Sequence, residues 1–206
     1  MASAIIHICV AKKVNEKLKM DENLLFLGAI APDISKEIGT SKNESHFIDN
    51  NLDIPNINKF LIKYQNEIKN PFEMGYLIHL LTDYYWYKYF FNNYVTNTKS
   101  VNLLNGSSII LNEENIRKLI YQDYTNINIA LIDEYAIELS LFSNEINYPS
   151  SKIDEIPMDK INIIIEKMGI IIKNSQDDKT IIFDMKEIIE FIENTTVKII
   201  NKLFPK

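Results

Sequence analysis

The sequence PFEMGYLIHLLTDYYWYKYFFNNY, residues 71–94, is apolar on nearly every side when it is written as a helix. Pro71 suits the first turn of a helix, because an N–H at that position would have no partner within the helix. A helix that is hydrophobic around most of its circumference is usually the buried, central one. The stretch therefore predicts a central helix over residues 71–93, around which the other elements pack.

Helical patterns recur on both sides of this stretch. Residues 3–18 place apolar side chains at helical spacing, with Ser3 as the expected N-cap. A second apolar run ends at Pro32, because the residue before a proline is pushed out of helical geometry. Asp184 is the expected N-cap of the last helix. Further helices are predicted from Pro55, near 113–140, near 158–173 and near 184–204, and the polar residues 33–54 are predicted to form a long functional loop.

The composition favours helices over sheets. The chain has 206 residues, of which 46% are hydrophobic, and this is enough for one sizeable core. It has only 5 glycines and 6 prolines, which leaves little turn chemistry for a many-stranded sandwich or barrel. We predict an all-α fold, a single-domain multi-helix bundle over residues 1–206.

Charge and targeting signals exclude several classes of protein. The net charge is −6 and no basic stripe is visible, so we expect no nucleic-acid partner. A lone cysteine, Cys9, excludes an internal disulfide. The N-terminus lacks the pattern of a signal peptide, and no run of about eighteen apolar residues predicts a transmembrane span. We expect a cytoplasmic protein, and the oligomeric state stays open.

His79 and Asp83 are four residues apart on the predicted central helix. Side chains at this spacing share one face of a helix, so an imidazole and a carboxylate can bind one ion without backbone distortion. Gly75 lies one turn earlier on the same face and leaves room for an ion or for another backbone. Glu73 and Tyr76 precede the pair within two turns and are candidates to orient the ligands, since metal-bound histidines usually need a partner on the other ring nitrogen. Taken alone, the pair is more often a core histidine hydrogen-bonded to an aspartate.

The remaining histidines and one aspartate favour a metal site. His7 lies among isoleucines on an apolar helix, and His46 lies in the polar loop with no obvious structural use. Asp33 directly follows Pro32, where it either projects inward or caps the next turn. Together with His79 and Asp83 these residues make five candidate ligands of mixed nitrogen and oxygen type, which suit zinc, manganese or iron.

Four segments of the first half carry a family resemblance. The strings MASAIIH, LFLGAIAPD, SHF and FEMGYLIHLLTDYYW resemble the zinc-dependent phospholipase C family, whose structural relatives include secreted zinc nucleases that cut single strands. The resemblance covers roughly residues 1–90. It implies an all-helical fold with up to three zinc ions. It further implies histidine ligands at His7, His46 and His79, a ligand or general base at Asp33, and a carboxylate at Asp83 that bridges two ions.

The second half departs from the family pattern. The family holds its remaining ion with two later histidines and an acidic residue, but this chain has no histidine after His79. A third ion is therefore absent or held by oxygen ligands alone, for which Asp123, Asp133 and Glu134 are candidates. Lys36, Lys42 and Arg117 are either phosphate contacts or scattered surface cations.

These observations predict a metal-dependent hydrolase, and more specifically a phosphoesterase that uses metal-activated water. We expect one or two Zn²⁺ ions, with Mn²⁺ or Fe²⁺ as alternatives, and a small phosphate ester as substrate. Asp33 is the expected catalytic residue, which orients or deprotonates the water. One alternative is a degenerate, non-catalytic protein that metal stabilises. A single-strand nuclease is less consistent with the acidic charge balance.

Overall fold

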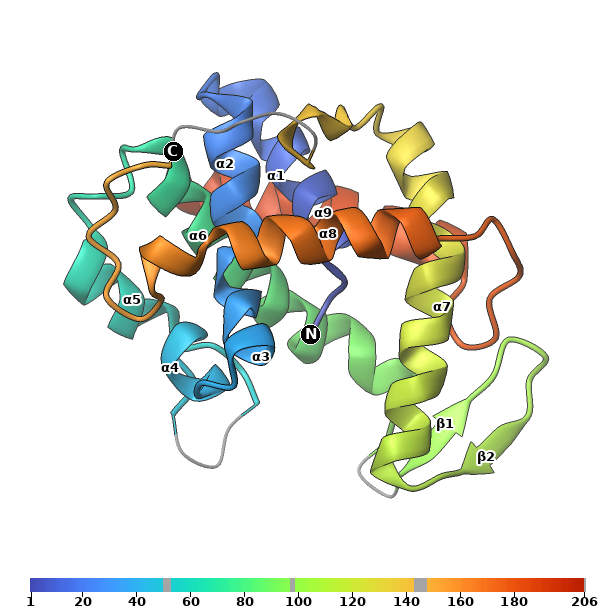
Figure 1. Cartoon of the computed structure of the whole chain (residues 1–206). Helices are drawn as coiled ribbons and strands as arrows, with labels where there is room; N and C mark the ends of the chain where they lie inside the picture. The colour runs from blue at the N-terminus through green and yellow to red at the C-terminus, as the bar shows by residue number, and fades with distance from the viewer. Residues whose placement is uncertain (50–52, 97–98, 143–147, 206) are drawn as a thin grey trace.

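The computed structural model describes residues 1–49, 53–96, 99–142 and 148–205 (Figure 1). Within these ranges the chain is predominantly helical, which confirms the all-α prediction. The α-helices are α1 (Ala4–Leu18), α2 (Glu22–Ile30), α3 (Ile34–Ile38), α4 (Lys42–Ser45), α5 (Ile57–Tyr64), α6 (Pro71–Tyr85), α7 (Glu113–Glu134), α8 (Asn162–Asn174) and α9 (Met185–Leu203). Shorter elements are η1 (Ala31–Asp33), η2 (Trp86–Phe90), η3 (Phe91–Asn93), η4 (Leu139–Phe142), η5 (Met158–Lys160), β1 (Ser100–Asn102) and β2 (Ser108–Ile110).

Helix α6 is the central element, as its sequence predicts. Every residue from Phe72 to Asp83 is buried. The helix continues past Tyr85 as one π-helical turn, η2, and then as the 3₁₀ turn η3. The helical segment predicted over residues 71–93 is therefore present, with a change of hydrogen-bonding type in its last third. Pro71 occupies the first turn of α6, as expected.

Helices α2 and α6 cross with their backbones in contact. A Cβ atom on Gly75 would lie 2.0 Å from the Leu25 carbonyl oxygen, and one on Gly28 would lie 2.0 Å from the Phe72 carbonyl oxygen. Neither position tolerates a side chain without moving a helix. Of the two roles considered for Gly75, the structure supports room for another backbone. Buried apolar side chains of α1, α2, α6 and α9 join one continuous core around this crossing.

Side-chain caps fix the ends of two helices where the sequence predicts them. The Ser3 hydroxyl accepts a hydrogen bond from the Ile6 N–H at the start of α1. The Asp184 carboxylate accepts hydrogen bonds from the N–H groups of Lys186 and Glu187 at the start of α9. Each cap satisfies N–H groups that have no partner within the helix.

The local structure contains two features that the sequence did not predict. Residues 33–54 were expected to form one long loop, but they contain helices α3 and α4 (residues 50–52 lie outside the described ranges). Helices of five and four residues are too short to show a periodic hydrophobic pattern. The second difference is the hairpin of β1 and β2, in which Val101 pairs with Ile109. Its three-residue strands are likewise too short to give a signal in the sequence.

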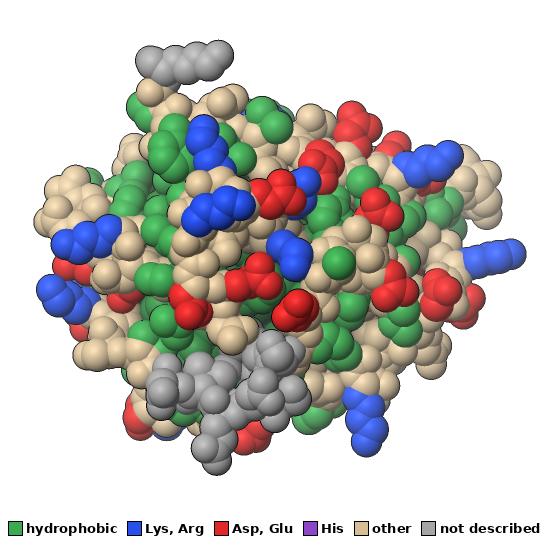
Figure 2. Space-filling view, turned by 90° about the horizontal axis from the view of Figure 1, so that it is seen from above, with side chains coloured by type: hydrophobic (Ala, Val, Ile, Leu, Met, Phe, Trp, Pro, Cys, Tyr) green, Lys and Arg blue, Asp and Glu red, His purple; other side chains and the backbone are tan. Residues whose placement is uncertain are grey.

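The surface carries charged side chains of both signs, as the composition of 22 basic and 28 acidic residues leads one to expect. Acidic and basic side chains are interspersed on the face in Figure 2, and no histidine is visible on its described part. Among the described residues, no helix is long and apolar enough to cross a membrane.

Candidate metal centre

The five predicted ligands converge at the centre of the fold. His7 comes from α1, Asp33 from the end of η1, His46 from the residue after α4, and His79 and Asp83 from α6. All three histidines are fully buried, and the two aspartates are nearly so. Their ligand atoms form two overlapping groups, one of His7, His79 and Asp83 and the other of Asp33, His46 and His79. The predicted convergence of these residues is therefore present in the structure.

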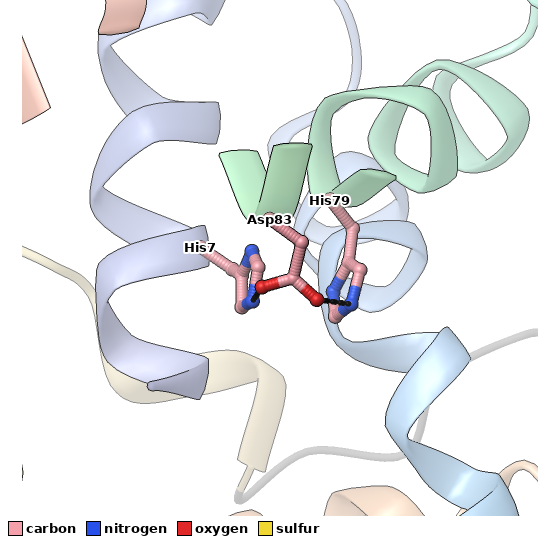
Figure 3. A group of neighbouring side chains, drawn as sticks. All are labelled: His7, His79 and Asp83. Carbon is pink, nitrogen blue, oxygen red and sulfur yellow. Dashed lines mark ion pairs between the residues drawn. The ribbon is translucent and has the colours of Figure 1, made fainter. Parts of the chain in front are cut away.

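The first group joins α1 to α6. Asp83 directs one carboxylate oxygen to His7 and the other to His79 (Figure 3). Its Oδ1 lies 3.4 Å from His7 Nε2, and its Oδ2 lies 3.7 Å from His79 Nε2. The two imidazoles stack, with ring centroids 3.8 Å apart and planes inclined by 12°. Asp83 Oδ1 also accepts a hydrogen bond from the Ala2 N–H at 2.9 Å.

The second group joins α6 to the segment that follows α2. Asp33 Oδ1 lies 3.5 Å from His46 Nε2, which itself lies 3.2 Å from His79 Nε2. His46 Nε2 is also 3.9 Å from Asp83 Oδ2, so the two groups are contiguous. A cation borders this group, because Lys36 Nζ lies 2.9 Å from Asp33 Oδ1.

His79 is oriented by the helix crossing. Its Nδ1 lies 2.7 Å from the carbonyl oxygen of Ala29, the residue after Gly28. A carbonyl oxygen can only accept, so Nδ1 carries the proton and the Nε2 lone pair of the neutral ring faces the cluster. The close contact between Gly28 and Gly75 brings α2 near enough for this bond. The sequence spacing identified His79, but it did not identify the carbonyl that fixes its tautomer.

Hydrogen bonds also position His46. Its Nδ1 lies 2.8 Å from the Ser45 hydroxyl oxygen, and the Tyr76 hydroxyl donates to the Ser45 carbonyl oxygen. Phe47 adopts a left-handed backbone conformation (φ 54°), which turns the chain at this point. Its ring packs edge-on against Phe60, at a centroid distance of 5.2 Å. The sequence indicated a role for Tyr76 near the ligands, but Ser45 carried no recognisable signal.

Burial and neighbouring charges set the protonation of the cluster. Burial lowers the pKa of His46 and lowers that of His79 further, so both rings are neutral near pH 7. Burial alone would raise the pKa of the Asp33 carboxyl, but Lys36 and the neighbouring imidazoles hold it well below its usual range. The His7 imidazole likewise outweighs burial and keeps the pKa of Asp83 low. His46 and His79 are therefore neutral and Asp33 and Asp83 are ionised, which are the forms in which these side chains bind metal.

The arrangement of donor atoms suits a metal ion. Two atoms that each lie about 2.1 Å from one tetrahedral ion are about 3.4 Å apart. The contacts that join the five residues span 3.2–3.9 Å and lie near this value. Three buried atoms of the first group have no hydrogen-bond partner among the described residues. They are both ring nitrogens of His7 and Oδ2 of Asp83. Buried polar atoms without partners are costly unless a ligand satisfies them. These buried groups could hold a metal ion.

The candidates for a third ion lie elsewhere. Asp123 is buried, but its carboxylate accepts hydrogen bonds from the N–H groups of residues 181–183 and so holds the loop before α9. Asp133 and Glu134 are exposed. Within the described part of the chain, none of the three belongs to a group of potential ligands. Glu73, expected to support a ligand, instead accepts a hydrogen bond from the Ser151 hydroxyl.

A cleft of about 1060 Å³ lies beside the cluster, and Asp33 lines it. Its walls include Lys36, Lys42 and Arg117, the three cations that the sequence left undecided between phosphate contacts and scattered surface charges. Apolar side chains of α8, such as Ile164 and Met168, also line the cleft. The cleft thus combines a carboxylate of the candidate centre, cations and an apolar surface.

Fold and site together define a helical protein with a buried histidine–aspartate centre that could bind metal. Comparisons of the chain with protein-family models, with curated proteins and with solved structures find no match. The geometry of this centre therefore carries the functional argument.

Proposed function

We propose that this protein is a metal-dependent phosphoesterase, with one or two zinc ions held by His7, Asp33, His46, His79 and Asp83. The observation that carries the proposal is the orientation of His79. Its Nδ1–H donates to the Ala29 carbonyl, and its Nε2 lone pair faces His46 Nε2 at 3.2 Å and Asp83 Oδ2 at 3.7 Å. A backbone carbonyl that fixes the tautomer of a histidine is a common support for a metal ligand.

The mixed nitrogen and oxygen ligands favour zinc over magnesium or calcium, and they leave manganese and iron as alternatives. The helical fold and the sequence segments around the five ligands support a centre of the zinc-dependent phospholipase C type. Because the described residues provide two overlapping ligand groups, we propose one or two ions and not three.

A divalent ion bound here would polarise a phosphoryl oxygen and make water nucleophilic near neutral pH. Asp33 faces both the cluster and the cleft, so its carboxylate is placed to orient the attacking water. Its low pKa makes it a weak proton acceptor, which favours this orienting role over that of a general base. Asp83 joins the two groups, because its Oδ1 faces His7 of the first group and its Oδ2 lies 3.9 Å from His46 Nε2 of the second.

The cations of the cleft suit a phosphate group. Lys36 Nζ lies beside Asp33, so it can contact a phosphate oxygen next to the ions. Lys42 lies over the Tyr87 ring at 5.8 Å, and no carboxylate of the described residues is within ion-pair distance of it. The modest number of these cations favours a small ester over a long polynucleotide.

The test combines metal analysis with activity. Protein purified without chelator and mildly loaded with zinc should carry one or two equivalents by elemental analysis. It should hydrolyse 4-nitrophenyl phosphate or bis(4-nitrophenyl) phosphate. Asp33→Asn should reduce kcat by at least about 100-fold, the lower range of a positioned catalytic group. Asp159→Asn, at an exposed aspartate of η5, is the matched control and should leave kcat unchanged.

Each result has a distinct meaning. Absence of bound metal in the loaded wild type would refute the metal centre itself. Bound metal without hydrolysis of either ester would support the non-catalytic alternative, in which the ion only stabilises the fold. Faster cleavage of single-stranded DNA than of the small esters would favour a nuclease.

A further inference from the structure

Asn128 is an unexplained polar side chain in the wall of the cleft. It belongs to α7 and is only 2% exposed. Its Oδ1 has no hydrogen-bond partner among the described residues. A buried amide that leaves one polar atom unpaired costs free energy, so the position calls for an explanation.

The hydrogen bonds of Ser175 identify which atom of the amide is free. The Ser175 hydroxyl donates its only proton to the Ile171 carbonyl oxygen at 2.9 Å. Its oxygen can therefore only accept from Asn128, whose Nδ2 lies 3.0 Å away. If the amide were turned over, the Ser175 hydroxyl would have to give up its bond to the Ile171 carbonyl in order to donate to Asn128. The unpaired atom of Asn128 is thus the carbonyl oxygen, an acceptor that requires a donor.

A chain of contacts links Asn128 to the metal centre. Asn128 lies one turn beyond Tyr124 on α7, and the Tyr124 hydroxyl donates to the Met1 carbonyl oxygen at 2.7 Å. The next residue, Ala2, donates its N–H to Asp83 Oδ1. Both Tyr124 and Asn128 line the same cleft as Asp33. A molecule that reaches from Asp33 along α7 therefore passes Asn128.

The surroundings of Asn128 are apolar. Ile164, Met168 and Ile171 of α8 line the cleft together with it, whereas Lys36 and Lys42 line it near the metal ligands. The geometry points to a substrate with two unlike parts. Its phosphate lies at the metal ions and cations, and its alcohol portion has an apolar body that carries a hydrogen-bond donor, a hydroxyl or an amine, to the Asn128 carbonyl. This inference rests on the proposed phosphoesterase function and assigns Asn128 as a specificity-determining residue.

Binding to the zinc-loaded full chain tests the assignment without relying on turnover. Phenyl phosphate is compared with its three hydroxyphenyl derivatives by isothermal titration calorimetry. The best hydroxylated ester should bind wild-type protein about 5- to 10-fold more tightly than phenyl phosphate, as one hydrogen bond to a buried acceptor provides. Asn128→Ala should abolish this preference.

Control variants distinguish the loss of the Asn128 carbonyl oxygen from a general disturbance of the fold. Asn126→Ala is the matched variant, because Asn126 is also buried on α7, but both ends of its amide are bonded, to Gln122 and to Lys179. It should keep the preference. Asn128→Leu has a similar volume but lacks the acceptor oxygen, so it should abolish the preference as Asn128→Ala does, and it covers the case in which Asn128→Ala does not fold.

The outcomes distinguish the two proposals. Two outcomes overturn the assignment of Asn128 but leave the phosphoesterase proposal intact. In the first, phenyl phosphate binds as tightly as its hydroxylated derivatives. In the second, the hydroxylated ester binds more tightly, but Asn128→Ala keeps this preference. Failure of every phosphate to bind opposes the phosphoesterase. In that case benzyl alcohol and toluene are compared by ligand-observed NMR, and equal binding of the two overturns the acceptor as well.

Discussion

The two ligand groups share His79 but differ in how their other members are held. In the first group, His7 and Asp83 project from two long helices, α1 and α6, and no lysine lies within ion-pair distance of them among the described residues. In the second group, Asp33 and His46 lie at the ends of two short elements, η1 and α4. There Lys36 contacts Asp33 and Ser45 contacts His46.

This difference suggests separate roles for the two groups, one in holding an ion and the other in the reaction. The first group is buried, and its atoms that lack a hydrogen-bond partner among the described residues are those that a bound ion would satisfy. The second group borders the cleft through Asp33 and has a cation beside it. Structural metal sites are closed by protein ligands, whereas catalytic sites keep a position open. Within the proposed function, the first group would therefore hold the more tightly bound ion, and the second group would provide the reactive position.

His79→Ala should have the largest effect, because it removes a ligand from both groups. Loss of a residue that only hydrogen-bonds to a metal ligand typically lowers metal affinity about 10- to 100-fold. Loss of the ligand His79 itself should lower it further. Elemental analysis after gel filtration should find less than a tenth of the wild-type metal. Circular dichroism should still show a helical protein. Retention of a full equivalent would mean that the first group does not depend on His79.

His7→Ala and His46→Ala should separate the groups. Each removes a ligand from one group only, so each should reduce the bound zinc by about one equivalent if two ions are present. His46→Ala should also abolish ester hydrolysis, whereas His7→Ala should lower the thermal stability of the zinc-loaded protein more. Complete loss of metal in both variants would instead indicate a single ion shared by all five ligands.

Ser45→Ala should have the smallest effect and should act on the second group alone. It removes the hydroxyl that accepts from His46 Nδ1–H when Nε2 binds metal, and such supporting partners contribute about 10- to 100-fold in affinity. Zinc titration with a competing chelator measures this change. Ser107→Ala, at an exposed hairpin serine, is the control and should bind as wild type does. Weakening of both ions in Ser45→Ala would contradict the separation of the groups.

Much of the helical framework could be predicted because long helices carry periodic patterns. The apolar surface of residues 71–93 predicted the buried α6, and Ser3 and Asp184 predicted two helix starts. The short helices α3 and α4 and the two hairpin strands gave no such pattern, since none of these helices and strands is longer than five residues. The same limit explains why Ser45, at the end of α4, was not recognised.

The sequence by itself determined which residue types are available for a metal centre. It also determined that His79 and Asp83 share one face of a helix, because side chains four residues apart in a helix project from the same side. It further made His7, Asp33 and His46 candidate ligands, but it did not identify the groups around them. Only the tertiary structure decided which groups these are. The Ala29 carbonyl that orients His79 lies 50 residues away along the chain, and the Ser175 hydroxyl that leaves the Asn128 carbonyl free is 47 residues from it. Such contacts depend on how closely helices approach, at Gly28 and Gly75 above all, and no local pattern records that distance.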